Sequence, residues 1–172
     1  MTDPTARIYM DHSATTPLDP RVLEAMLPYF SEQFANSKAI HSFGREAEQA
    51  IDAARHTVAR ILNCKPREVV FTSGGSESDN LALRGLAQVA RSQDKPFTLV
   101  TSPVEHTAVS VTARQLRDVL GIALRVVSVD RYGRVDPDDL RATLQNLPAD
   151  GITLVSLMHA NNEIGTHSPV PE

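Results

Sequence analysis

Three short segments of this chain contain polar residues of the kinds that bind anions and move protons. They are Gly75-Ser76, Glu105-His106 and His159-Ala160-Asn161-Asn162-Glu163. Each follows an apolar run typical of a strand, and the ends of parallel strands meet at one edge of their sheet. The sequence therefore predicts a site assembled from three loops that are far apart along the chain.

The first segment lies where a strand pattern gives way to a helical one. Ser76 is predicted to cap the helix, and Asp79 three residues later completes an approximate capping box. Gly74 and Gly75 would let the backbone approach a ligand closely, since they have no Cβ. Unpaired N–H groups and the partial positive charge at a helix start attract anions, so the functional interpretation is a phosphate or carboxylate site. The alternative is a well-capped structural helix.

The other two segments offer a histidine and an amide pair. A histidine with an ordinary pKa of roughly 6.5 suits proton transfer, and its ring can also stack on another ring. The alternative for His106 is an exposed loop histidine. The alternative for Asn161-Asn162-Glu163 is ordinary turn chemistry, in which asparagine side chains bond to nearby backbone. The histidines show no metal-ligand spacing with one another or with Cys64, so no metal site is predicted. We interpret Cys64 as structural.

The apolar periodicity predicts the elements that would position these residues. A short kinked helix is expected from Asp19-Pro20 to Phe30, a longer one from Ser42 to Leu62, and a short buried strand over residues 68–72. After the Gly75 turn and its helix, the predicted order is strand 97–101, helix 107–120, strand 124–129, helix 137–147 and strand 152–158. This alternation predicts an α/β fold with a mostly parallel sheet covered on both faces.

The bulk composition limits the remaining possibilities. A chain of 172 residues can bury one core without a second domain, so a single compact unit is expected. A net charge of −4 and the absence of a Lys/Arg run argue against nucleic acid as a partner. No apolar run is long enough to span a bilayer and no signal peptide is recognisable, which predicts no membrane association and a cytoplasmic location. Residues 166–172 follow a strand and its loop without a further helix, a pattern expected where a fold is interrupted.

Five ordered motifs span residues 9–20, 40–44, 71–80, 105–109 and 158–165. Together they resemble the N-terminal part of cysteine desulfurases. These are pyridoxal 5'-phosphate (PLP) enzymes of the class V aminotransferase group, with the aspartate aminotransferase fold (fold type I). The resemblance covers nearly the whole chain and implies that residues 1–172 form the N-terminal segment and the first part of the PLP-binding large domain, with the C-terminal remainder absent.

The resemblance also implies a role for each candidate residue. Gly75 and Ser76 correspond to the loop that binds the cofactor phosphate. His106 corresponds to the histidine that stacks on the cofactor ring and is a candidate catalytic proton carrier. Asn162 corresponds to the side chain that contacts the ring hydroxyl. In the family, L-cysteine becomes L-alanine, and its sulfur passes through an enzyme persulfide to iron–sulfur cluster assembly or other sulfur-acceptor proteins. Family members are usually homodimers.

The chain departs from the family pattern in two places. Residues 35–39 read Ala-Asn-Ser-Lys-Ala where the family often has Gly-Asn-Pro-Ser-Ser, which predicts an altered loop near the site entrance. His12 stands where the family often has Asn or Tyr.

The resemblance places several essential residues beyond Glu172. They are the Schiff-base lysine, the aspartate that pairs with the pyridine nitrogen, the catalytic cysteine and the substrate-carboxylate arginine. Lys38, Lys65 and Lys95 do not match the Schiff-base position, so this chain alone is expected to be inactive. Two alternatives stay open: a non-catalytic half-fold interaction protein, and one chain of a split PLP enzyme. The later strands of the family sheet are also absent, so the strands present either pair in another order or leave unpaired edges.

Overall fold

The computed structural model describes residues 7–169 and divides into two compact units, with the boundary between Phe71 and Thr72. This corrects the expectation of a single unit. Both buried apolar clusters are built from side chains at Leu83 and beyond, so the N-terminal residues take part in neither core.

The N-terminal unit is helical. It contains α1 (Pro20–Met26), α2 (Pro28–Ser31), α3 (Ser42–Ile61) and the 3-10 turn η1 (Pro66–Glu68). The Asp19 side chain accepts a hydrogen bond from the Arg21 N–H and caps α1, as its position before Pro20 suggested. The predicted kinked helix is in fact two helices, because Pro28 has no N–H and begins a new first turn. The long helix α3 ends one residue earlier than expected.

The strand predicted over residues 68–72 does not form. Glu68 ends η1, and the residues after it are outside any strand. Val70 and Phe71 are 65% and 50% exposed instead of buried. A strand requires a partner for its backbone N–H and C=O groups, and the three described strands pair with one another instead of with this segment.

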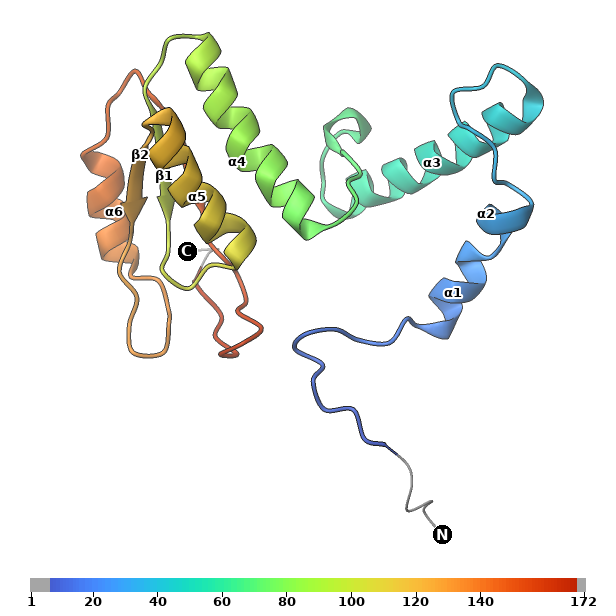
Figure 1. The fold of residues 1–172 in the computed structure, drawn as a ribbon, viewed down its shortest axis with the longest axis horizontal. Helices are drawn as coiled ribbons and strands as arrows, with labels where there is room; N and C mark the ends of the chain where they lie inside the picture. The colour runs from blue at the N-terminus through green and yellow to red at the C-terminus, as the bar shows by residue number, and fades with distance from the viewer. Residues whose placement is uncertain (1–6, 170–172) are drawn as a thin grey trace. The chain divides into compact units, whose positions relative to one another are not determined.

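The C-terminal unit has the predicted βα alternation (Figure 1). Its elements are α4 (Gly75–Ser92), β1 (Phe97–Thr101), α5 (Thr107–Leu120), β2 (Ala123–Val126), α6 (Pro137–Gln145) and β3 (Ile152–Ser156). The strands form one parallel sheet in the order β2-β1-β3. At its carboxyl edge, Thr101 lies opposite both Val126 and Ser156. The prediction of a parallel sheet is confirmed.

Three predicted elements extend too far. β2 ends at Val126 instead of residue 129, because Val129 forms an isolated antiparallel bridge with Val135 across a tight turn. β3 ends at Ser156 instead of residue 158, and the Met158 N–H is bonded by a side chain from another loop. Helix α6 ends at Gln145, two residues before the predicted end.

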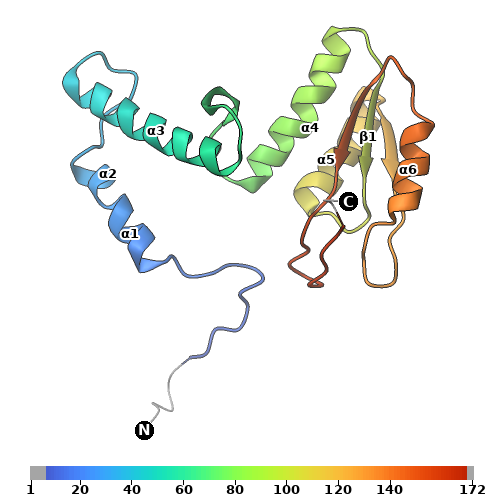
Figure 2. The ribbon, with the colours of Figure 1, turned by 180° about the vertical axis from the view of Figure 1, so that it is seen from behind.

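Helices cover both faces of the sheet (Figures 1 and 2). Phe97 and Leu99 of β1 belong to a cluster shared with α4 and α5, whereas Val100 belongs to a second cluster that packs against Leu140 of α6. This alternation follows from the two-residue period of a strand. All five residues of the central strand β1 are buried, which fixes its register and hence the positions of the loops that follow.

The outer edges of β2 and β3 pair with no other described strand. Val126 is 56% exposed and Val155 is 38% exposed. Of the two arrangements considered from the sequence, unpaired edges are therefore observed. Such edges present unbonded N–H and C=O groups that can pair with a further strand. In the described range, none of the helices has the length and apolar character required to cross a bilayer.

Candidate active site at the carboxyl edge of the sheet

The loops after β1 and β3 enclose a cavity of about 160 Å³. His106 and Asn162 both contribute to its wall, so the structure brings together two residues that are far apart in sequence. The full lining is Val104, Glu105, His106, Thr107, Met158, Asn161, Asn162 and Glu163. The prediction that polar residues after these two strands meet at one edge is confirmed for both loops.

His106 is held by the helix that it begins. It is the N-cap of α5, and its Nδ1 accepts a hydrogen bond from the Ala108 N–H at 3.1 Å. A neutral imidazole that accepts at Nδ1 carries its hydrogen at Nε2. The residue is exposed, as the loop-histidine interpretation expected, but the capping bond gives the ring a defined position.

The two interpretations of the amide pair apply to different residues: Asn161 forms the turn, and Asn162 lies at the cavity. The Asn161 Oδ1 accepts hydrogen bonds from the N–H groups of Glu163 and Ile164, at 2.9 and 3.1 Å, and so performs the turn chemistry. Gly165, at φ +70°, completes this turn in the left-handed region. The next residue, Asn162, is exposed at the cavity wall.

Side chains also connect the two loops directly. The Glu105 Oε1 accepts from the Ser102 hydroxyl at 2.7 Å and from the Met158 N–H at 2.8 Å. In the opposite direction, the Asn161 Nδ2 donates to the Val104 carbonyl at 2.9 Å. In the sequence, Glu105 and Asn161 stand out only as parts of their motifs, because no sequence pattern reports bonds across more than fifty residues.

The predicted cap of α4 is wrong by two positions. The helix begins at Gly75 with Gly74 as its N-cap, so Ser76 is the second helical residue. The predicted partner Asp79 is replaced by Glu77, whose carboxylate accepts from the N–H and the hydroxyl of Ser73 at 2.7 and 2.6 Å. These bonds lower the pKa of Glu77, and the bond from the Ser73 hydroxyl has the larger effect. Glu77 reaches the residue before the N-cap, which a serine-based capping box does not anticipate.

The start of α4 retains the features expected of an anion site. The first N–H groups of a helix have no partner within it and carry partial positive charge. A Cβ built on Gly74 or Gly75 would meet no atom within 4 Å, so a ligand has room beside this backbone.

Gly75 and Ser76 do not line the His106 cavity, but contacts place the first turns of α4 at the same sheet edge. Asp79 shares a small cavity with Val109 of α5 and Ser156 at the end of β3. At the next residue, the Asn80 Oδ1 accepts from the Thr112 hydroxyl of α5 at 3.0 Å.

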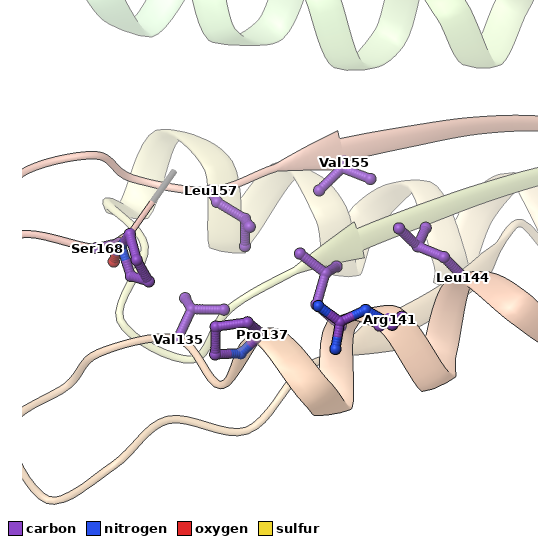
Figure 3. Close-up of a pocket in the computed structure, with 9 residues that line it drawn as sticks. Val135, Pro137, Arg141, Leu144, Val155, Leu157 and Ser168 are labelled. Atoms are coloured by element: carbon purple, nitrogen blue, oxygen red, sulfur yellow. The ribbon is translucent and has the colours of Figure 1, made fainter. Parts of the chain in front are cut away.

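A larger cavity of about 510 Å³ lies on the face of the sheet that α6 covers, between α6 and β3 (Figure 3). Its wall contains none of the residues singled out from the sequence. Apart from Arg141 and Ser168 the lining is apolar, and it includes Val155 and Leu157 as well as Leu140 and Leu144 of α6. Because this lining offers no group for proton transfer, we place the candidate site at the smaller, polar cavity. In residues 7–169, no group of three or more His, Cys, Asp or Glu residues is arranged to hold a metal ion.

The family comparison and the curated relatives give a consistent assignment. Residues 8–172 match the family model described as aminotransferase class-V. The chain is 48% identical over 166 residues to a cysteine desulfurase IscS from Anaeromyxobacter sp. (strain Fw109-5), covering 96% of this chain and 39% of that protein. It is 46% identical over 165 residues to the cysteine desulfurase IscS of Dictyoglomus turgidum, covering 96% of this chain and 40% of the relative.

Solved structures agree with this assignment. A NifS-like protein superposes with a TM-score of 0.85 at 38% identity, covering 96% of this chain and 43% of the other. A structure described as SspA in complex with cysteine superposes with a TM-score of 0.81 at 35% identity, covering 94% of this chain and 45% of the other. The chain thus spans about two fifths of the length of its curated relatives, and its parallel sheet is an incomplete α/β domain of fold type I. It belongs to the class-V aminotransferase family, in a region similar to cysteine desulfurases.

Proposed function

We propose that this chain forms part of a PLP-dependent cysteine desulfurase. Such an enzyme converts L-cysteine to L-alanine and passes the sulfur on as a persulfide. The observation that carries the proposal is the shared cavity of His106 and Asn162, at the sheet edge where α4 also begins. The similarity to proteins named cysteine desulfurases supports the reaction, and the relative described in complex with cysteine supports the substrate.

The residues present fit PLP. The N–H groups of Gly75 and Ser76, with open space beside the backbone, suit its phosphate. The exposed ring of His106 is available to stack on the pyridine ring, and the amide of Asn162 suits the ring hydroxyl. When bound, PLP supplies an electron sink for charge that develops at the substrate α-carbon.

His106 would transfer a proton from an imidazole ring that is already oriented. Because Nδ1 accepts the Ala108 N–H, the Nε2 nitrogen is the one that carries the exchangeable proton of the neutral ring. The capping bond orients the imidazole before a ligand arrives, which lowers the entropic cost of alignment. Asn162 has a binding and orienting role, since an amide neither gains nor loses a proton near neutrality.

The complete reaction requires groups outside the 172 residues. We infer that the Schiff-base lysine, the aspartate for the pyridine nitrogen, the sulfur-accepting cysteine and the arginine for the substrate carboxylate belong to the part of the relatives that this chain does not span. By itself the chain would be inactive. The complete protein would act as a homodimer and deliver sulfur to an acceptor protein for iron–sulfur clusters or another product.

A non-catalytic interaction protein is a second candidate, and the unpaired edge of β3 favours it. Such an edge can accept a strand from another chain. A split enzyme is the related case, in which the second chain supplies the lysine and the cysteine. Stable co-purification without alanine formation would support the interaction protein, and recovery of alanine formation on mixing two chains would support the split enzyme.

The test is to purify the protein from its natural gene, determine its intact mass, and measure alanine formed from L-cysteine in the presence of PLP. We expect alanine formation, and a loss of roughly 10²-fold or more in His106→Gln, the usual scale for removing a general acid or base. Glu46→Ala, at an exposed position of α3, is the control and should retain full activity. A PLP-bound protein that forms no alanine from L-cysteine would refute the desulfurase proposal.

A further inference from the structure

We propose that Glu105 and Asn161 form a reciprocal clamp that sets the separation between His106 and Asn162. Each clamp residue directly precedes one of the two residues that it positions. The catalytic meaning of the clamp rests on the proposed function, but its existence as a structural device does not.

Glu105 provides the first half of the clamp. Its Oε1 accepts two hydrogen bonds, one from Ser102 in its own loop and one from the Met158 N–H in the other loop. Ser102 is 3% exposed and Glu105 is half-buried, so water competes poorly for these bonds. Removal of the carboxylate would leave the Met158 N–H without this acceptor.

Asn161 provides the second half. Its Nδ2 donates to the Val104 carbonyl, while its Oδ1 holds the turn at Glu163 and Ile164. The donor and acceptor demands fix the orientation of the amide, since only the nitrogen can donate to a carbonyl. One end of Asn161 therefore shapes its own loop, and the other end attaches that loop to the neighbouring one.

The place of the clamp explains why it is needed. The last paired residues of β1 and β3 are Thr101 and Ser156, and beyond them the sheet no longer holds the two segments together. His106 lies five residues past this point and Asn162 six residues past it, by their positions in the sequence. Two side-chain bonds across the gap replace the missing ladder, so the two site residues move as one unit.

A separate contact supports the Asn162 loop from its other side. The Thr166 hydroxyl donates to the Tyr132 carbonyl at 2.5 Å, in the turn that follows β2. Gly133 in this turn, at φ +78°, lies so close to Ile164 that an added Cβ would come within 2.5 Å of its Cδ1. The turn after β2 thus limits outward movement of the loop, while the clamp fixes its distance from His106.

The test uses the full 172-residue chain and amide hydrogen exchange measured by NMR. In Glu105→Ala, we expect exchange at Met158 to accelerate by about ten- to a hundredfold, the scale for losing a bond to a charged acceptor. Glu105→Gln keeps a carbonyl oxygen at the same position, so its acceleration should be smaller. Asn161→Asp keeps the turn acceptors but replaces the donor to Val104, and the Asn162 backbone resonances should shift as they do in Glu105→Ala.

Two features of the readout separate a clamp from general destabilisation. A merely destabilising change would accelerate the slow amides of β1, such as Leu99, by the same factor as Met158, whereas a clamp predicts a selective effect at Met158 and Asn162. Glu46→Ala should change neither. Unaltered exchange at Met158 in Glu105→Ala, or acceleration equal to that of Leu99, would overturn the proposal.

A cofactor measurement distinguishes failure of the clamp from failure of the proposed function. The probe is 4-deoxypyridoxine 5'-phosphate, which has no aldehyde and therefore forms no imine with lysine, titrated into the protein expressed from its natural gene after its PLP has been removed. If the wild type binds, we expect about tenfold weaker binding in Glu105→Ala, and equal binding would overturn the positioning role. If the wild type does not bind, the proposed function is contradicted, and the exchange experiment still decides whether the clamp exists.

Discussion

His106 combines two roles that substitutions can separate, because Nδ1 caps α5 while Nε2 holds the ring proton. His106→Ala removes both roles and should lower the free energy of unfolding by about 1 kcal/mol, the usual cost of losing an N-cap side chain. His106→Asn supplies another good capping residue, so we expect near-native stability without proton transfer. Chemical denaturation and alanine formation, measured on the same variants, test this. Equal stability of the two variants would contradict the capping role.

Thr101 and Thr112 provide a matched pair of buried hydroxyls, at 3% and 4% exposure. The Thr101 hydroxyl has no hydrogen-bond partner in the described part of the chain, whereas Thr112 donates to Asn80. Thr101→Val should therefore raise the free energy of unfolding by about 1 kcal/mol, because an unsatisfied buried hydroxyl is costly. Thr112→Val should lower it by about the same amount. Urea denaturation of both variants checks the opposite signs, and destabilisation by Thr101→Val would show that its hydroxyl is bonded.

At the scale of elements, we expect the stability contributed by the start of α4 to depend on pH. The bonds from Ser73 lower the pKa of Glu77 below its ordinary value of 4.5 in the folded protein. A carboxyl group with a lowered pKa stabilises the fold above its unfolded pKa, and this contribution is lost as the pH falls through the folded pKa. Glu77→Gln should therefore make the stability less dependent on pH below about 4.5. Thermal denaturation of wild type and variant from neutral to acidic pH tests this, with Glu46→Gln as control. Parallel pH profiles would rule out the linkage.

The elements that the sequence predicted well are those whose signals are local. Helix α5 is recovered with the predicted bounds because its periodicity and its caps, His106 and the left-handed Gly121, lie within the helix or next to it. The segment over residues 68–72 has an equally apolar pattern, yet it forms no strand, since a strand also requires a partner that local sequence does not report. The ends of β2 and β3 were missed for the same reason.

The candidate site shows the same limit. Parallel-sheet topology was sufficient to predict that His106 and Asn162 meet, because strand ends share an edge. The distribution of roles between Asn161 and Asn162 was not predictable, as either asparagine could have formed the turn. The bond from the Met158 N–H to Glu105 depends on three-dimensional placement alone.

At the scale of the molecule, burial differs sharply between the two units. Among residues 7–71 only Gly44, Ala47 and Ala59, all in α3, are buried. With so few buried residues these helices gain little from packing, which is the main source of helical stability in proteins. We therefore expect the amides of α1, α2 and α3 to exchange with solvent much faster than those of β1, whose five residues are all buried. Native-state hydrogen exchange measures this, and protection of α3 equal to that of β1 would show that the two units share one cooperative core.

The order β2-β1-β3 also has a consequence for synthesis on the ribosome. The central strand is made first, and its second neighbour is completed only when Ser156 has been added. At about 5–20 residues per second, the roughly fifty residues between the ends of β1 and β3 take several seconds to translate. During this interval β1, whose five residues are all buried in the finished sheet, has an open edge in the nascent chain. The time of greatest exposure to aggregation therefore comes before release, when protection depends on the translation rate and on chaperones at the tunnel exit.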